Sequence, residues 1–174
     1  PLAKLAKSVN AGIEVKREYS VERDGKWQML DDKSKLETGE IVRVDLFLSL
    51  PAARNFVVVD DPVPGGLEPV NADLATASKL DAEKGDFAAA GGSYWFKFQD
   101  WQDFGYSRWS FYHRELRHDA VRFYSESLSP GNYHLSYTAQ VIAPGEFTVM
   151  PVMAQEMYDT DVYGKDVPFT LNVE

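Results

Sequence analysis

The sequence contains no cysteine among its 174 residues. A chain without thiols forms no disulfide, offers no thiolate ligand to a metal ion, and has no cysteine nucleophile. This absence excludes all three kinds of site within the chain. It leaves the redox compartment open.

Long hydrophobic runs are also missing, because no stretch approaches the roughly 18 consecutive apolar residues of a membrane-spanning helix. The first residues, PLAKLAKS, lack an initiator methionine, and their lysines interrupt the hydrophobic core that a signal peptide needs. We therefore expect no direct membrane contact by this chain. We interpret it as a fragment of a longer protein whose targeting information lies outside it.

Basic residues are scarce, with 18 Lys and Arg against 27 Asp and Glu and a formal net charge of −9. The resulting field repels phosphate backbones, so we do not expect a nucleic-acid partner. Apolar residues make up 44% of the chain and aromatic residues 13%, which is enough for a substantial core. This length favours one domain over two.

Apolar and polar residues alternate along most of the chain, which is typical of half-buried β-strands. The pattern predicts strands over residues 12–21, 26–30, 41–50, 56–59, 112–117, 120–125, 133–141, 147–153 and 167–173. Between them, DDPVPGGLEP at 60–69 predicts an irregular passage. Asn71 is a suitable cap for a short helix that ends near Leu80.

The arrangement of these elements predicts an all-β fold, an antiparallel immunoglobulin-like β-sandwich with one short helix. We expect the sandwich domain to span residues 12–174 and to carry an insertion at 71–110. Residues 1–11 are expected to be a linker or the end of a preceding domain. The insertion is rich in aromatic residues, which we expect to be mostly packed: Trp95, Phe96, Phe98, Trp101, Phe104, Tyr106 and Trp109.

Residues 137–163 predict a hairpin with the turn APGE at 143–146 between its strands. Its second strand ends in an apolar and aromatic cluster of Met157, Tyr158 and Tyr163. Such a cluster is either the rim of a core or a contact patch. Tyr124 has the parity to face away from its own core, so it joins the patch if its strand lies beside the hairpin.

The densest group of titratable residues is HRELRHD at 113–119. It suggests either a metal or acid–base site, or a solvated strand with cross-strand ion pairs. In a strand, His113 and His118 point to opposite sides, which favours ion pairs. A hydrolase centred on His113 and Glu115 is a distant alternative.

Asp60, Asp61 and Glu68 raise the possibility of calcium, but their spacing matches no compact calcium-binding loop. The same holds for Asp159 and Asp161. The paired glycines at 65–66 and 91–92 lack the lysine and helix start of a phosphate-binding loop. We therefore predict no catalytic residue, no metal site and no cofactor.

Five segments in order carry a resemblance to a known family. They are DKSKL at 32–36 with GE at 39–40, VDDPVPGGLEPVN at 59–71, ELRHDAV at 115–121, YTAQVIAPGEF at 137–147 and EMYD at 156–159. Together they span nearly the whole chain. The chain resembles the C-terminal macroglobulin-like domain of bacterial α2-macroglobulins, the large thioester-containing protease traps, and looks most like the enterobacterial form.

The resemblance implies a domain that performs no chemistry and is not an enzyme. In similar proteins a separate domain carries a thioester that acylates an attacking protease after a bait region is cut. The resemblance implies that this chain packs on that thioester domain, shields the bond from water and relays the rearrangement after cleavage. Tyr158, with Met157 beside it, resembles the shielding residues, and Tyr124 is a second candidate. Tyr163 completes the expected interdomain contact.

The resemblance also implies the partners and the compartment. The thioester domain and neighbouring macroglobulin-like domains of the same parent chain are the expected partners, and target proteases are bound through the full-length protein. A periplasmic location is implied, with the parent anchored to the inner membrane as a lipoprotein. The alternative function is a stand-alone immunoglobulin-like adhesion or carbohydrate-binding module whose insertion aromatics stack on a ligand.

Overall fold

A computed structural model describes residues 6–70, 101–102 and 110–174. The helix expected at 71–80 and most of the aromatic-rich insertion lie outside these ranges. No helix in the described part of the chain is long and apolar enough to cross a membrane.

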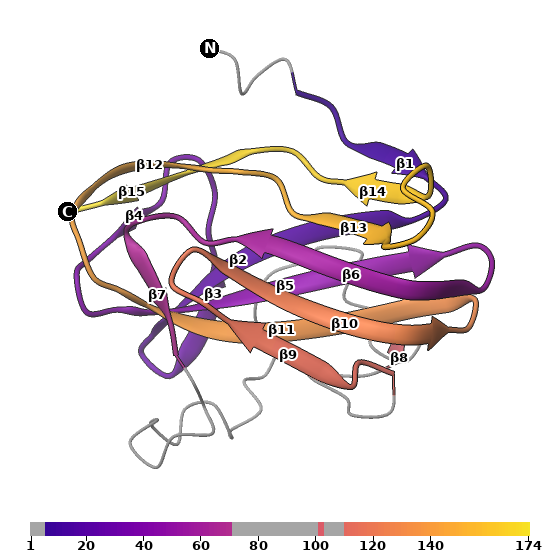
Figure 1. The fold of residues 1–174 in the computed structure, drawn as a ribbon. Coiled ribbons are helices and arrows are strands. Elements are labelled where there is room, and N and C mark those ends of the chain that lie inside the picture. The colour runs from indigo at the N-terminus through magenta and orange to yellow at the C-terminus, as the bar shows by residue number, and fades with distance from the viewer. Residues whose placement is uncertain (1–5, 71–100, 103–109) are drawn as a thin grey trace.

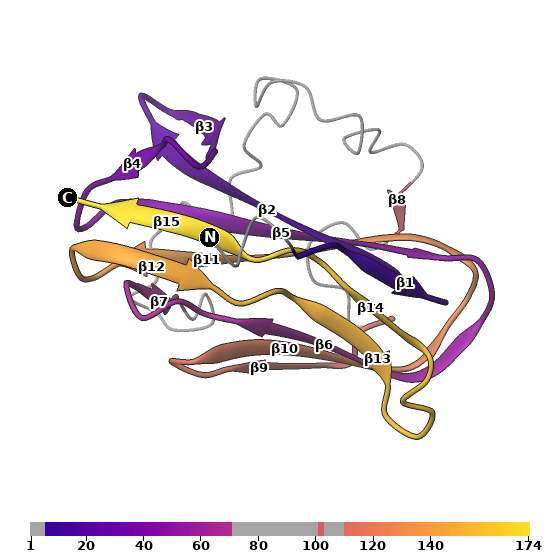
Figure 2. The same ribbon diagram turned by 90° about the horizontal axis from the view of Figure 1, so that it is seen from above.

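The described residues form two large sheets packed face to face and one small sheet (Figures 1 and 2). Sheet 1 has the order β1-β14-β13-β6-β10-β9, with the bounds Val9–Ala11, Tyr163–Lys165, Met153–Glu156, Arg54–Pro62, Ala120–Leu128 and His113–Leu116. Sheet 2 has the order β3-β2-β5-β11-β7, with the bounds Lys26–Met29, Glu14–Arg23, Ile41–Leu50, Gly131–Val141 and Leu67–Pro69. Neighbouring strands on both of these paths are antiparallel.

Sheet 3 is small and has the order β12-β15-β4, with the bounds Gly145–Val149, Phe169–Val173 and Lys35–Leu36. A further short strand, β8 (Trp101–Gln102), runs parallel to β11. The predicted all-β antiparallel sandwich is therefore confirmed. Residues 9–11, which fall in the stretch expected to precede the domain, pair with β14 at the edge of sheet 1.

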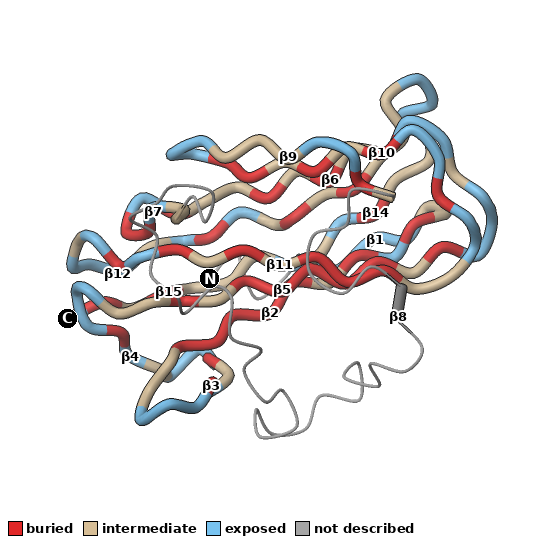
Figure 3. The backbone as a smooth tube through the Cα atoms, turned by 90° about the horizontal axis from the view of Figure 1, so that it is seen from below, coloured by how far each residue is buried: buried red, intermediate tan, exposed pale blue. Residues whose placement is uncertain are grey.

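The core lies between sheets 1 and 2, and the apolar members of the alternating pattern fill it. On β5 the predicted inward face is confirmed, because Val42, Val44, Leu46 and Leu48 are all fully buried. Val57 and Phe123 meet them from β6 and β10 of sheet 1. Figure 3 shows the buried positions lying along the strands and the exposed residues concentrated in turns and at strand ends. On β5, five consecutive residues from Val44 to Leu48 are buried, so both faces of this strand are covered there. Each such aliphatic or aromatic side chain contributes about 1.5–3 kcal/mol on full burial.

The hairpin predicted over residues 137–163 is wrong. β11 pairs with β5 and β7 in sheet 2, β12 pairs with β15 in sheet 3, and β13 pairs with β6 and β14 in sheet 1. The chain changes sheets at Met150 and Pro151, where proline has no N–H to continue a ladder. The hairpin in this region is β13–β14, with residues 157–162 as its loop.

The irregular passage predicted at 60–69 is also wrong in part. β6 continues through Asp60 and Asp61 to Pro62, and β7 covers Leu67–Pro69. Pro62 is the last residue of β6, and the next residue, Val63, still donates its N–H to the carbonyl of Asp119. Between residues 60 and 69, the strand structure is therefore interrupted only at residues 63–66.

Gly164 in β14 packs so closely on the chain before β2 that a Cβ would overlap the carbonyl oxygen of Ile13. Backbone cannot yield as a flexible side chain does, so Gly164→Ala is expected to lower the free energy of unfolding by about 1–3 kcal/mol. Urea denaturation of this chain measures the change. Lys165→Ala, at the exposed neighbouring position, is the control, and equal losses in both variants would refute the packing explanation.

Candidate functional site

The loop of the β13–β14 hairpin, residues 157–162, presents an aromatic side chain to solvent. Tyr158 is 83% exposed, so it does not belong to the core. Backbone hydrogen bonds from Glu156 N to Val162 O (3.0 Å) and from Val162 N to Asp159 O (3.1 Å) close the loop. The exposed ring therefore sits on a short loop with its own hydrogen bonds.

Phe56 of β6 supports Tyr158 from the neighbouring strand. The two ring centroids are 5.1 Å apart and the ring planes are 80° apart, which is an edge-to-face contact. The backbone N–H of Met157 donates to the carbonyl of Phe56 at 2.8 Å. Phe56 is itself 44% exposed. We call Phe56, Met157 and Tyr158 the aromatic tip.

The two other predicted residues, Tyr124 and Tyr163, lie on the outer face of sheet 1. The register places Tyr163 opposite Gln155, Gln155 opposite Val58, Val58 opposite Tyr124, and Tyr124 opposite His113. Residues that are directly opposite point to the same face. We call these five residues the outer row. Tyr124 and Tyr163 are three strand spacings apart, or about 14 Å.

The outer row points away from the sandwich core. The residues that flank Val58 and Tyr124 along their strands are buried, whereas Val58, Tyr124 and Tyr163 are half-buried. The aromatic tip adjoins the row where β6 begins and β13 ends. The structure therefore places Tyr124 and Tyr163 in one row on sheet 1 and Met157 and Tyr158 in the hairpin loop next to it, and it adds Phe56, which the sequence did not indicate.

Charged residues on this face of β6, β9 and β10 form a network of ion pairs and hydrogen bonds. Arg122 lies 3.1 Å from Asp60 and 3.6 Å from Glu115, and Tyr124 donates to Glu115 at 3.3 Å. Arg117 donates to Glu115 at 2.6 Å, and this hydrogen bond is the main cause that lowers the pKa of Glu115. The charge of Asp60 is the main cause that raises the pKa of Arg122. These are the cross-strand ion pairs expected for this segment.

A general base centred on Glu115 does not fit this arrangement. Its carboxylate already accepts hydrogen bonds from Arg117 and Tyr124, and a lowered pKa makes it a poor proton acceptor near neutral pH. His113 lies beside the Tyr124 ring, with centroids 5.6 Å apart, on the same face. Of the two residues of the hydrolase alternative, Glu115 therefore belongs to the ion-pair network and His113 lies beside it.

The acidic residues considered for calcium do not converge. Asp61 is fully buried and points into the core, whereas Asp60 points to the outer face and pairs with Arg122. Glu68 belongs to β7 of the other sheet. Within the described ranges, no group of three or more His, Asp or Glu side chains is arranged to hold a metal ion.

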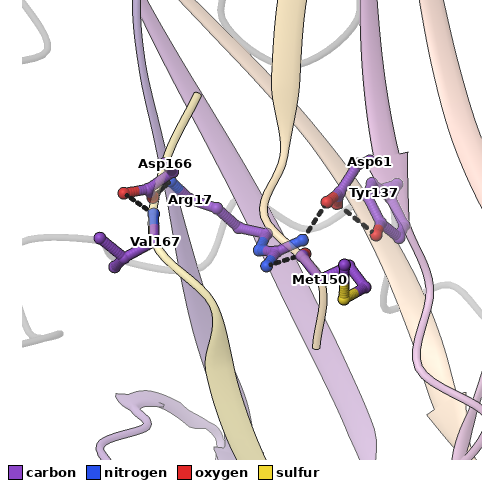
Figure 4. A network of polar contacts seen from close by, with 6 residues as sticks. All are labelled: Arg17, Asp61, Tyr137, Met150, Asp166 and Val167. Carbon is purple, nitrogen blue, oxygen red and sulfur yellow. Dashed lines mark hydrogen bonds and ion pairs between the residues drawn. The ribbon is translucent and has the colours of Figure 1, made fainter. Parts of the chain in front are cut away.

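A buried polar network centred on Arg17 holds the connections on either side of the β13–β14 hairpin (Figure 4). The Arg17 guanidinium forms an ion pair with Asp61 and donates to the carbonyl of Met150 at 2.7 Å. The hydroxyl of Tyr137 donates to Asp61 at 2.7 Å, and the backbone N–H of Arg17 donates to Asp166 at 2.8 Å. Met150 precedes β13 and Asp166 follows β14. Arg17 is therefore hydrogen-bonded to the chain on both sides of the β13–β14 hairpin.

The electrostatics keep this network hydrogen-bonded. Burial is the main cause that raises the pKa of Tyr137, so its hydroxyl remains a donor to Asp61. Burial also acts to lower the pKa of Arg17, but the nearby charges, Asp61 above all, outweigh it and the pKa is raised. Burial raises the pKa of Asp61, while Arg17 and Tyr137 act in the opposite direction. The sequence signal for this buried network was Arg17 itself, a charged residue on the otherwise apolar face of β2.

A second buried ionic cluster lies on the face of sheet 2 that points away from the core. Asp45 and His134 are both fully buried, with His134 Nε2 2.7 Å from Asp45 Oδ1. Arg43 donates to the same oxygen at 3.1 Å, and Phe47 stacks on His134 at a centroid distance of 4.8 Å. Phe47, an apolar residue on the polar side of its strand, was the sequence signal that this face is covered.

Comparison with known proteins gives a family. The model of the bacterial alpha-2-macroglobulin MG10 domain matches residues 12–161. An alpha-2-macroglobulin homolog from Nostoc sp. is 24% identical over 145 residues, which cover 83% of this chain and 6% of that protein. The chain therefore spans a small part of the length of this relative.

Solved structures share the fold. Escherichia coli alpha-2-macroglobulin activated by porcine elastase has a TM-score of 0.73 at 19% identity, covering 97% of this chain and 14% of that one. Salmonella alpha-2-macroglobulin reacted with methylamine has a TM-score of 0.66 at 18% identity, covering 96% and 10%. Native E. coli alpha-2-macroglobulin from domain MG7 to the C-terminus has a TM-score of 0.66 at 22% identity, covering 96% and 24%. The chain belongs to the family of bacterial alpha-2-macroglobulin MG10 domains.

Proposed function

We propose that this domain is a noncatalytic part of a bacterial α2-macroglobulin that inhibits proteases. Its aromatic tip and outer row pack on the thioester domain of the same parent chain and keep water from the thioester. The observation that carries this proposal is the 83% exposure of Tyr158 on a hydrogen-bonded loop, in contact with a second exposed ring. Exposed aromatic residues grouped in this way are typical of surfaces that a partner covers.

The chemistry of the relatives supports a role in protecting a reactive acyl group. The Salmonella relative reacts with methylamine, and the E. coli relative is activated by porcine elastase or by trypsin. An acyl group that small amines attack is also open to hydrolysis, so exclusion of water preserves it until a protease arrives. A large ring supplied by a neighbouring domain provides that exclusion.

The internal anchoring of the domain supports the proposed relay of the rearrangement after bait cleavage. Arg17 joins sheet 2 to Asp61 of sheet 1 and to Met150 beside the β13–β14 hairpin. Such links make the tip move with the whole sandwich. A displacement of the domain in the cleaved parent then carries Tyr158 away from the bond.

The proposed partners are the thioester domain and the adjacent macroglobulin-like domains, with target proteases engaged by the full-length protein. We place the parent in the periplasm, anchored to the inner membrane as a lipoprotein. The carbohydrate-binding alternative depends on the aromatic residues of the insertion, most of which lie outside the described residues.

Cysteine accessibility tests the proposed packing. In the full-length parent, Tyr158→Cys is expected to react slowly with a maleimide before bait cleavage, and as fast afterwards as in this chain alone. Ile142→Cys is the matched control. Ile142 is 47% exposed and lies in the β11–β12 turn at the opposite end of the sandwich (Figure 1).

The unsubstituted parent supplies the background from any thiol that opening of the thioester releases. Fast labelling of Tyr158→Cys in the uncleaved parent would contradict packing of the tip on another domain.

A further inference from the structure

Phe56 has an unusual backbone conformation for its side chain. Its φ is +51°, in the left-handed region that bulky residues rarely occupy. Among the described residues, Asp24 is the other non-glycine residue with positive φ, and it lies in the turn between β2 and β3. Aspartate tolerates that conformation in turns. Phe56 instead lies within a strand, so its conformation needs another explanation.

The surroundings of Phe56 point to the aromatic tip as that explanation. Its carbonyl accepts the hydrogen bond from Met157 N–H, and its ring meets Tyr158 edge to face. The preceding residue adds a further link, because Asn55 N–H donates to Glu156 Oε1 at 2.9 Å. The start of β6 therefore contacts three consecutive residues of the hairpin, and the strained residue is at the centre of these contacts.

Core packing does not account for the strain. Phe56 is 44% exposed, so its ring contributes little to the sandwich core. Strained residues persist where the surrounding structure holds them, and they cluster at functional positions. We infer that Phe56 is a positioning residue that holds the Tyr158 ring in the orientation in which it meets the thioester domain. This inference rests on the proposed function.

The edge-to-face contact explains how Phe56 acts. The Phe56 ring occupies the space on one side of the Tyr158 ring. This excludes conformations in which the Tyr158 side chain packs flat over the start of β6, so the side chain projects from the loop. A side chain already held in its bound orientation loses less conformational entropy on docking. Without the Phe56 ring, Tyr158 samples more orientations and covers the thioester for less of the time.

Four variants of the full-length parent test this role: Phe56→Ala, Phe56→Asn, Phe56→Tyr and Tyr158→Ala. The measured quantity is the rate at which methylamine consumes the thioester in the absence of protease. Phe56→Ala and Phe56→Asn are expected to raise this rate by about two- to tenfold, the range given by the energy of one aromatic pair. Phe56→Tyr keeps the ring and is expected to restore the parental rate.

Asparagine separates positioning from stability, because it adopts positive φ more readily than alanine. Phe56→Asn is therefore expected to be more stable than Phe56→Ala in urea denaturation and yet equally deficient in protection. Combining Phe56→Ala with Tyr158→Ala is expected to add nothing to Tyr158→Ala alone.

A spectroscopic readout on this chain keeps the two proposals distinguishable. NMR couplings that report the χ1 rotamer of Tyr158 are expected to show one dominant rotamer in the unsubstituted chain and in Phe56→Tyr, and averaging over several rotamers in Phe56→Asn. Unchanged rotamer populations in Phe56→Asn overturn the positioning role, whatever the rates are. If Tyr158→Ala alone speeds the amine reaction and the Phe56 variants do not, Phe56 has no part in protection. If Tyr158→Ala leaves the rate unchanged, the shielding function itself is wrong.

Discussion

Replacing Asp61 by alanine is expected to lower the free energy of unfolding of this chain by about 3–5 kcal/mol, the usual cost of breaking a buried ion pair. Asp61 is fully buried and Arg17 is 8% exposed, so the guanidinium would remain in the core without its counter-ion. The hydroxyl of Tyr137 would lose its acceptor as well. The loss therefore combines an unpaired charge with an unsatisfied donor.

Urea denaturation of the variant and of the parent chain measures this difference. Asp60→Ala is the matched control, because Asp60 is the adjacent residue and pairs with Arg122 on the outer face. A half-exposed pair of this kind contributes about 0–1 kcal/mol. If the two alanine variants lose the same small amount of stability, the Arg17 network does not hold the sheets together as described.

The long central strand was predictable from the sequence. β5 has the predicted bounds, because apolar residues at every second position from Val42 to Leu50 specify both the strand and its inward face. The shortest strands, such as β4 and β14, have two or three residues and carry no pattern of their own. They form because a neighbouring strand offers hydrogen-bonding partners. The local sequence carries no information about that neighbour.

The error over residues 137–163 has a physical cause. Phe147, Val149 and Met153 share one parity, so they resemble a single strand, but the chain crosses from sheet 3 to sheet 1 between Val149 and Met153. Proline at 151 was a local sign of that break. The choice of sheet depends on long-range pairing with β15 and β6, and periodicity does not specify it.

The geometry of the candidate site was not predictable from the sequence. Met157 and Tyr158 were singled out by their place after a strand and by resemblance, and the structure places them at a solvent-exposed tip. That Tyr124 and Tyr163 share the outer row depends on register across three strand pairs, which a single sequence does not give. Phe56 was missed because nothing in the sequence marks a phenylalanine for positive φ.

We propose that Tyr158 shields a thioester in the uncleaved parent. Tyr158→Ala removes a large ring whose burial against a partner is worth about 1.5–3 kcal/mol, which corresponds to about ten- to a hundredfold in rate. Because the ring is 83% exposed in this domain, the substitution is expected to change the stability of the domain itself by less than about 0.5 kcal/mol. Ile142→Ala, at an exposed apolar residue in the β11–β12 turn, is the control.

The measurement is the rate at which methylamine consumes the thioester in uncleaved, full-length parent protein that carries each substitution. We expect Tyr158→Ala to speed this reaction by about ten- to a hundredfold and Ile142→Ala to leave it unchanged. A rate in Tyr158→Ala equal to that of the unsubstituted parent would contradict the shielding role of the aromatic tip.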